Sequence, residues 1–252
     1  MRIAVYSGSF NPLHIGHQAI MEYLTREKKF DWVYLVVSPK NPLKDSISAD
    51  SGRDRYNAAV EAVKRHPDLH VWVDDIELNM DPPHYTIRTL DELKRREPEN
   101  DFTLIIGADN LSSIHKWRDF PRLLAEYGVA VYPRTGYDLS KIRQDLMDEC
   151  FLNPALYVLD GSYSDPDKLT LEDAERHLYH IQILDAPTVD ISSTEIRDGL
   201  ARGEDMSRFM MKESAEESND SEAALELSFG VMTDEDFVLT RFLAPFVIRT
   251  EE

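Results

Sequence analysis

Short apolar segments alternate with segments of helical periodicity along the first 205 residues, and this alternation restricts the fold more than any other feature. Continuous apolar runs are typical of strands buried in a parallel sheet, whereas apolar residues three and four positions apart indicate helices. The expected strands are 2–7, 32–37, 70–73, 102–106, 129–132 and 180–184. The expected helices are 15–26, 53–65 and 86–96, with another beginning at Ser192. This order predicts an α/β fold with a doubly wound parallel sheet, whose ligands bind beyond the carboxyl ends of the strands.

The chain changes character after residue 205. Residues 203–252 contain 13 Asp and Glu but only 4 Lys and Arg, a net charge of −9, and segment 213–228 is rich in serine and acidic residues. Such a composition disfavours a packed core. We therefore expect a domain of residues 1–205 followed by an acidic extension of residues 206–252. Segment 237–248 is apolar enough to form a strand or a short helix, and its periodicity does not decide between them.

The formal net charge of −19 argues against nucleic acid and acidic membranes as partners. A nucleotide would have to bind in a local pocket rather than by attraction to the whole molecule. No apolar run reaches the length of a membrane-spanning helix and the N-terminus lacks a signal peptide, so we expect a cytoplasmic protein. A homo-oligomer stays open. The single cysteine, Cys150, excludes an internal disulfide framework and is expected to be a buried, unreactive thiol.

A strand, a glycine turn and the start of a helix follow one another at residues 8–17, GSFNPLHIGH. This arrangement binds phosphate, because free backbone N–H groups and the positive helix end point at the anion. Gly8 lets the backbone approach a ligand closely. His14 and His17 are three residues apart, so on a helix they share a face and can donate hydrogen bonds to phosphate oxygens. One histidine here would be unremarkable, but the pair in this context indicates a phosphate site.

A second motif, ISSTEIR, lies near the end of the expected domain. Ser192 and Glu195 fit a capping box, which predicts a helix start. Helix capping alone would explain the motif, with Arg197 an exposed arginine. In the alternative interpretation, Ser193, Thr194 and Arg197 gather at the positive helix end and bind a triphosphate.

Together the two motifs resemble the HxGH and ISSTxIR elements of a nucleotidyltransferase superfamily with a Rossmann-like fold. Residues 1 to about 200 are similar to bacterial nicotinate mononucleotide adenylyltransferases. The intermediate features that carry the resemblance are PKNPLK at 39–44, HYT at 84–86, IIGAD at 105–109 and Lys116–Trp117. The resemblance implies transfer of the adenylyl group of ATP to nicotinate mononucleotide in NAD biosynthesis, giving deamido-NAD and pyrophosphate, with Mg²⁺ accompanying the ATP.

The resemblance also implies roles for individual residues. The catalytic residues it implies are His14, His17, Lys44 and Arg197. The ATP-binding residues it implies are Gly8, Ser9, His17, Gly107, Asp109, Ser192, Ser193, Thr194 and Arg197. The mononucleotide-binding residues it implies are Ser9, Phe10, Lys44, Tyr85, Thr86 and Trp117. No metal site made by protein side chains is expected, because Mg²⁺ would be held largely by phosphates and water.

Several of these residues also have a simpler explanation. Lys44 could be a solvated loop lysine, Asp109 a helix N-cap and Trp117 a core side chain. The resemblance instead places Lys44 at the mononucleotide phosphate, Asp109 with Gly107 at the ATP ribose, and Trp117 against the pyridine ring.

The helix expected to begin at Thr86 is the proposed receptor of the nicotinate carboxylate, because its first N–H groups can bind an anion. His84 occupies the position where the family usually has serine. The backbone role should survive this difference, but the contact of the side chain stays open.

The implied reaction needs no general base, because the attacking phosphate is already an anion. Catalysis would rest on positioning and on neutralising charge, which His14, His17, Lys44 and Arg197 are expected to supply. Two alternatives stay open: a preference for nicotinamide mononucleotide, and a nucleotide-binding regulator without turnover. A dinucleotide-dependent dehydrogenase is disfavoured, because the first turn lacks the GxGxxG spacing.

Overall fold

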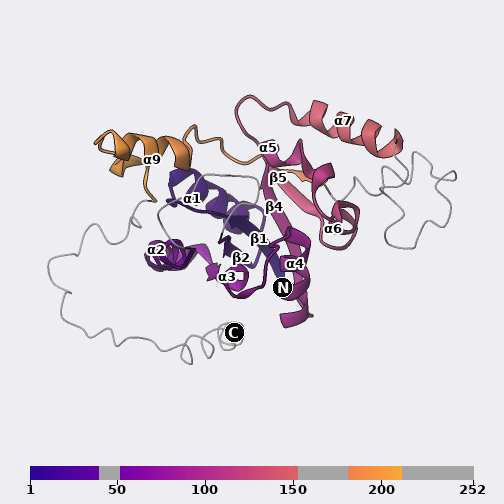
Figure 1. The fold of residues 1–252 in the computed structure, drawn as a ribbon, viewed down its shortest axis with the longest axis horizontal. Helices are drawn as coiled ribbons and strands as arrows, with labels where there is room; N and C mark the ends of the chain where they lie inside the picture. The colour runs from indigo at the N-terminus through magenta and orange to yellow at the C-terminus, as the bar shows by residue number, and fades with distance from the viewer. Residues whose placement is uncertain (40–51, 153–180, 212–252) are drawn as a thin grey trace, which may run out of the picture. The chain divides into compact units, whose positions relative to one another are not determined.

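The structure, a computed structural model, describes residues 1–39, 52–152 and 181–211. Its centre is a sheet of six parallel strands in the order β3-β2-β1-β4-β5-β6 (Figure 1). The strands are β1 Arg2–Gly8, β2 Trp32–Val37, β3 Val71–Asp74, β4 Asp101–Gly107, β5 Val129–Tyr132 and β6 Ile181–Ile183. The chain builds one half outward from β1 and the other outward from β4, so the prediction of a doubly wound parallel sheet is confirmed.

The helices observed include every one that was predicted. They are α1 Ile15–Glu22, α2 Gly52–Lys64, α3 Ile76–Asn79, α4 Thr86–Arg96, α5 Ala108–Leu111, α6 Phe120–Glu126, α7 Leu139–Leu152 and α9 Ser193–Ala201. A π-helical turn, Tyr23–Glu27, continues α1, and short 3-10 turns lie at Pro67–Leu69, Ile114–Lys116 and Ser207–Phe209. The sequence interpretation omitted α3, α5, α6 and α7. Two of these have only four residues, too few to display a helical period.

Both faces of the sheet are covered, as the apolar runs predicted. Ile3 and Val5 of β1 pack on one face with side chains of α4, α5 and α6. Ala4 and Tyr6 point to the other face and pack with side chains of α1 and α2. Because successive side chains of a strand alternate between faces, a strand covered on both sides must be apolar throughout. The buried core leaves the carboxyl ends of the strands as the place where polar side chains can meet.

The last described residues pack on this fold. Met206 lies against Gly199 of α9, where an added Cβ would approach its sulfur to 2.6 Å. Met210 forms an isolated antiparallel bridge with His14, and Met211 is buried in the same apolar cluster as Tyr6. The compact unit runs from Met1 to Glu213. The predicted acidic extension of residues 206–252 stays a prediction, because 212–252 lie outside the described residues.

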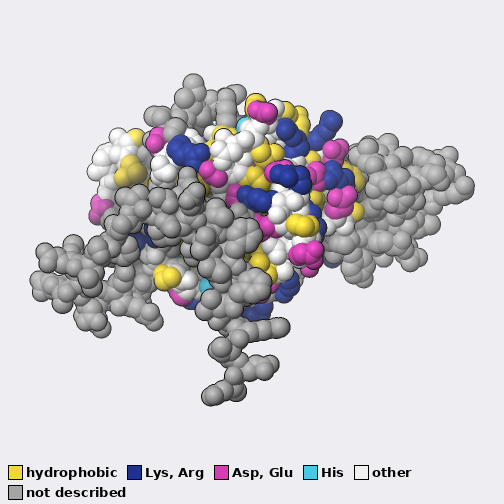
Figure 2. All heavy atoms as spheres, turned by 90° about the horizontal axis from the view of Figure 1, so that it is seen from below, with side chains coloured by type: hydrophobic (Ala, Val, Ile, Leu, Met, Phe, Trp, Pro, Cys, Tyr) yellow, Lys and Arg dark blue, Asp and Glu magenta, His cyan; other side chains and the backbone are white. Residues whose placement is uncertain are grey.

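Charged side chains of both signs are mixed on the visible face of the described residues (Figure 2). On the face drawn in Figure 2, the described Lys and Arg side chains are interspersed with Asp and Glu side chains. Within ranges 1–39, 52–152 and 181–211, no helix combines the length and the apolar character needed to cross a membrane. The burial predicted for Cys150 concerns a side chain outside the described part of the structure.

Candidate active site

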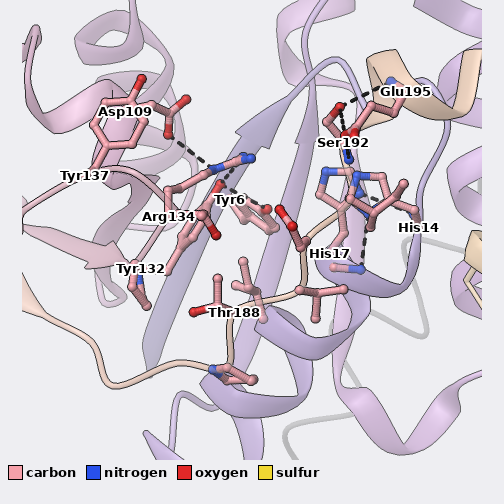
Figure 3. A pocket seen from close by; sticks show the side chains of 18 residues that line it. Tyr6, His14, His17, Asp109, Tyr132, Arg134, Tyr137, Thr188, Ser192 and Glu195 are labelled. Carbon is pink, nitrogen blue, oxygen red and sulfur yellow. Dashed lines mark hydrogen bonds and ion pairs between the residues drawn. The ribbon is translucent and has the colours of Figure 1, made fainter. Parts of the chain in front are cut away.

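A cavity of about 290 Å³ opens at the carboxyl ends of β1, β4 and β5, beside the start of α1 and the start of α9 (Figure 3). The polar residues that line it are Tyr6, His14, His17, Asp109, Tyr132, Arg134, Thr135, Tyr137, Thr188, Asp190, Ser192 and Glu195. Strands β1 and β4 are the neighbours at which the winding of the sheet reverses. The cavity therefore lies at the switch point where doubly wound sheets bind their ligands.

The histidine pair lies at the very start of α1 and forms its cap. His14 is the N-cap residue, and its Nδ1 accepts a hydrogen bond from the backbone N–H of Gly16 at 3.1 Å. The Nδ1 of His17 accepts one from the backbone N–H of His14 at 3.3 Å. The centroids of the two rings are 3.7 Å apart. A Cβ on Gly16 would lie 3.0 Å from the His14 ring, so glycine at this position leaves room for the pair.

These hydrogen bonds determine which nitrogen of each ring carries the proton. In a neutral imidazole an Nδ1 that accepts a hydrogen bond leaves the proton on Nε2, so both Nε2–H groups are available as donors. Burial, followed by the charge of Arg134, lowers the pKa of His14 to about 4. Burial and then the neighbouring His14 lower the pKa of His17 well below its usual value. Both shifts favour the neutral imidazole in the ligand-free protein. The expectation that these histidines supply positive charge concerns the protein with its substrates bound and stays a prediction.

Arg134 supplies the positive charge that the histidines do not. Among the described residues, it is the only Lys or Arg that lines the cavity. Its Nη2 donates to the hydroxyl of Tyr132 at 3.1 Å, and its Nε lies 3.3 Å from Oδ1 of Asp109. The sequence interpretation missed Arg134, Tyr132 and Tyr137. A signal for them was available: Tyr132 ends the predicted strand 129–132, and Arg134 and Tyr137 follow it. Polar residues that follow a parallel strand face the edge of the sheet where ligands bind.

The second motif begins helix α9 with a capping box. Ser192 caps α9: its Oγ accepts from the N–H of Glu195 at 3.2 Å, and the Glu195 carboxylate accepts from the N–H of Ser192 at 2.8 Å. This confirms the predicted capping box.

The contacts to the first motif come from Ser193 and Arg197. The hydroxyl of Ser193 donates to the carbonyl of Pro12 at 3.2 Å. The guanidinium of Arg197 donates to the carbonyl of Asn11 at 2.7 Å and to the hydroxyl of Thr194 at 3.1 Å. The structure thus joins motifs about 180 residues apart. Ser192 lines the cavity, whereas Ser193 and Arg197 hold the turn of the first motif and Thr194 contacts Arg197.

Asp109 lines the cavity, and it does not cap a helix. The N-cap of α5 is Gly107, and Asp109 is in the first turn. A Cβ on Gly107 would approach Oδ1 of Asp109 to 2.3 Å and Nε of Arg134 to 3.0 Å. Glycine at 107 is therefore what allows the carboxylate and the guanidinium to come together.

Of the residues expected at the pyridine ring, Tyr85 and Thr86 begin α4, and Trp117 follows the 3-10 turn Ile114–Lys116. Tyr85 is the N-cap, its side chain makes no capping hydrogen bond, and its ring is 40% exposed. The guanidinium of Arg118, the residue after Trp117, lies 6.0 Å from the centroid of the Tyr85 ring. Trp117 is half-buried and packs partly against the apolar cluster below. The core contact agrees with the simpler interpretation of Trp117, and its stacking on the pyridine ring stays a prediction.

The remaining residues of the first motif that the structure describes at the end of β1 are Gly8, Ser9 and Phe10. Ser9 is exposed, and its carbonyl accepts a hydrogen bond from Arg55 at 2.6 Å. The Phe10 ring is buried and packs edge-on against Tyr6 and His17, so only its backbone can meet a ligand. Gly8 leaves space for that ring, since a Cβ there would be 3.1 Å from it. Lys44 lies outside the described residues.

Comparison with known proteins agrees with this geometry. Residues 5–199 match the family model described as cytidylyltransferase-like. A protein of Flavobacterium psychrophilum named "probable nicotinate-nucleotide adenylyltransferase" is 33% identical over 200 residues, which cover 79% of this chain and 86% of that protein. One of Porphyromonas gingivalis with the same name is 34% identical over 206 residues, which cover 82% and 87%.

A solved structure shares the fold. Plasmodium falciparum nicotinic acid mononucleotide adenylyltransferase, complexed with NaAD, superposes with a TM-score of 0.58 at 16% identity, over 83% of this chain and 90% of that one. The family model, the relatives and the two joined motifs all indicate a nucleotidyltransferase. The chain is a nucleotidyltransferase of the cytidylyltransferase-like family and belongs with the proteins named nicotinate-nucleotide adenylyltransferase.

Proposed function

We propose that this enzyme transfers the adenylyl group of ATP to nicotinate mononucleotide, giving deamido-NAD and pyrophosphate, and so serves NAD biosynthesis. The observation that carries the proposal is the pair of neutral histidines, whose Nδ1 atoms are held by backbone N–H groups and whose Nε2–H groups remain as donors in the cavity. The relatives that share about a third of the sequence are named for this activity.

The reaction exchanges one phosphorus–oxygen bond for another. A phosphate oxygen of the mononucleotide forms a bond to the α-phosphorus of ATP. The bond from that phosphorus to the oxygen that bridges to the β-phosphate breaks, and pyrophosphate leaves with the electron pair. The attacking oxygen is already anionic, so neither a general base nor an enzyme nucleophile is required. The protein must therefore align the two substrates and stabilise charge on the phosphoryl oxygens.

The described side chains divide this work. His14 and His17 donate hydrogen bonds to phosphate oxygens without adding a charge that must be desolvated. Arg134 adds the positive charge inside the cavity, and its ion pair with Asp109 fixes its position. Arg197 positions the turn before His14 through the carbonyl of Asn11. Lys44 is assigned to the mononucleotide phosphate by the family resemblance alone.

Mg²⁺ is proposed to enter with ATP and to neutralise part of the charge on its phosphates. Among the described residues, no three His, Cys, Asp or Glu side chains are grouped so that they could hold a metal ion. Asp109, Asp190 and Glu195 do line the cavity, and their oxygen atoms suit a hydrated Mg²⁺. Asp109, Asp190 and Glu195 would supply oxygen acceptors to the water molecules of an ion held mainly by the nucleotide, although Asp109 is paired with Arg134 and Glu195 with Ser192 in this structure.

The test is a turnover assay on the purified full chain with ATP, Mg²⁺ and either mononucleotide. We expect pyrophosphate release that depends on nicotinate mononucleotide, with deamido-NAD identified by mass. Faster turnover of nicotinamide mononucleotide would favour the alternative of an enzyme that prefers that substrate. ATP binding without release of pyrophosphate in the presence of either mononucleotide would refute the proposal and favour a regulator.

A further inference from the structure

A buried carboxylate, that of Glu77 in α3, lies outside the cavity and has no part in the chemistry described above. Its side chain is only 4% exposed. The hydrogen bonds described for it all come from hydroxyl groups: Thr89 donates to its Oε1 at 2.9 Å, Ser7 at 3.5 Å, and Ser38 also contacts the carboxylate. Burying a carboxylate costs free energy unless its oxygens accept hydrogen bonds. The segments that carry the three hydroxyls are therefore held at fixed positions around Glu77.

The three hydroxyls come from the elements that carry the expected mononucleotide site. Ser7 is the residue before Gly8 at the end of β1, and Ser38 directly follows β2. Their hydroxyls are 3.1 Å apart, so the two strand ends are joined to each other as well as to Glu77. Thr89 lies in the first turn of α4, and its hydroxyl is also 3.5 Å from the carbonyl of Tyr85, the N-cap. Glu77 thus links the phosphate end of the site to the start of the helix expected to receive the nicotinate carboxylate.

A buried arginine extends the same connection on the other side. The guanidinium of Arg55 is 5% exposed and donates to the carbonyl oxygens of Ser9, Ser38 and Pro39 at 2.6, 2.9 and 2.8 Å. It thereby holds the loop after β1 against the end of β2. The residues of this connection are absent from the lining of the cavity. The connection made by Glu77 and Arg55 therefore supports the side of the site formed by β1, β2 and α4, and not the side formed by β5 and α9.

We propose that Glu77 is a positioning residue for the mononucleotide: it sets the distance between the end of β1, which carries the phosphate-binding turn, and the N-terminus of α4. This inference rests on the proposed function and assigns to Glu77 no contact with either substrate. Because the hydroxyl cluster reaches the start of α4 and lies outside the cavity lined by β5 and α9 residues, its loss should weaken binding of the mononucleotide much more than binding of ATP.

The experiment compares Glu77→Gln and Thr89→Val with the matched control Glu97→Gln. Glu97 lies at the opposite end of α4, and its carboxylate also accepts two hydrogen bonds, from Tyr34 at 2.8 Å and Asn100 at 2.6 Å. We expect both test variants to raise KM for nicotinate mononucleotide about tenfold or more, since a tenfold change corresponds to about 1.4 kcal/mol, less than a hydrogen bond to a charged group can contribute. KM for ATP should stay within about twofold, and Glu97→Gln should leave both constants within about twofold.

A purely structural role predicts a different pattern. Glu77 would not be a positioning residue if KM for the two substrates rose together, if Glu97→Gln gave the same change, or if neither test variant altered KM for the mononucleotide. If the wild type turned over neither mononucleotide, the proposed function would fail by itself. Amide hydrogen exchange would then test Glu77 without turnover. Backbone amides in the first turn of α4 should exchange faster in Glu77→Gln than in the wild type and at the wild-type rate in Glu97→Gln. Equal exchange rates in Glu77→Gln and the wild type would overturn the proposal.

Discussion

Replacing His17 by alanine tests the part of the site that the structure describes best. The change removes one Nε2–H donor from the cavity and one capping bond, in which Nδ1 accepts the N–H of His14 at 3.3 Å. Loss of one donor that stabilises developing charge lowers kcat about 10²–10³-fold, equivalent to about 2.7–4 kcal/mol. Loss of a helix cap costs about 0.5–2 kcal/mol, a small part of the 5–15 kcal/mol that stabilises a typical domain. The variant should therefore fold and be almost inactive.

Pyrophosphate release under saturating ATP and nicotinate mononucleotide gives kcat, and thermal unfolding gives the stability. The matched control is Gln18→Ala, which removes a neighbouring side chain that bonds Glu22 at 3.1 Å and does not line the cavity. His17→Gln keeps a neutral donor and should recover part of the rate. A kcat for His17→Ala within threefold of the wild type would remove His17 from the catalytic residues. If kcat/KM of the wild type changed with an apparent pKa near 6.5 and His17→Gln abolished that change, the claim that both histidines are neutral would be refuted.

Four other outcomes follow from the same structure. Nicotinate mononucleotide should exceed nicotinamide mononucleotide more than about 30-fold in kcat/KM, because the N–H groups at the start of α4 favour a carboxylate and oppose the amide N–H₂; equal values would refute that receptor. Arg134→Met should lower kcat/KM at least about tenfold at pH 7.5, and an unchanged value would exclude Arg134 from ligand binding. The pKa of His14 in the folded protein, about 4, lies below its unfolded value, so the unfolded state binds more protons between these values. Stability should fall as the pH drops from 6.5 towards 4, by up to about 3 kcal/mol, and denaturant titrations should show a smaller loss for His14→Gln. A chain that ends at Glu213 should keep its melting temperature and activity, whereas one that ends at Arg208 should melt lower because it lacks Met211; equal melting would contradict that packing role.

Local patterns in the sequence were sufficient where one physical effect dominates. The apolar runs at 32–37 and 129–132 form β2 and β5 over those very residues, because a strand buried on both faces must be continuously apolar. The Ser192–Glu195 spacing placed the start of α9 correctly, because a capping box is satisfied within four residues. The short helices α3 and α5 carried no such signal, since four residues do not complete a period that can be recognised.

The motifs identified the chemistry, but their charge and their partners depended on the fold. His14 and His17 were recognisable from their spacing, yet their neutrality results from burial and from Arg134, which follows a different strand. Arg197 was expected at the triphosphate from its position in the helix, and the structure shows its guanidinium on the carbonyl of Asn11.

The alternation of strands and helices, the class of sheet and the two motifs could be predicted from the chain, because each depends on neighbours within a few positions. The contact of Arg134 with Asp109 in the cavity, and the hydroxyls from β1, β2 and α4 around Glu77, became visible only in three dimensions. These contacts join segments that lie far apart along the chain. Their energies depend on burial and distance in three dimensions, and neither quantity is encoded in the spacing of residues along the sequence.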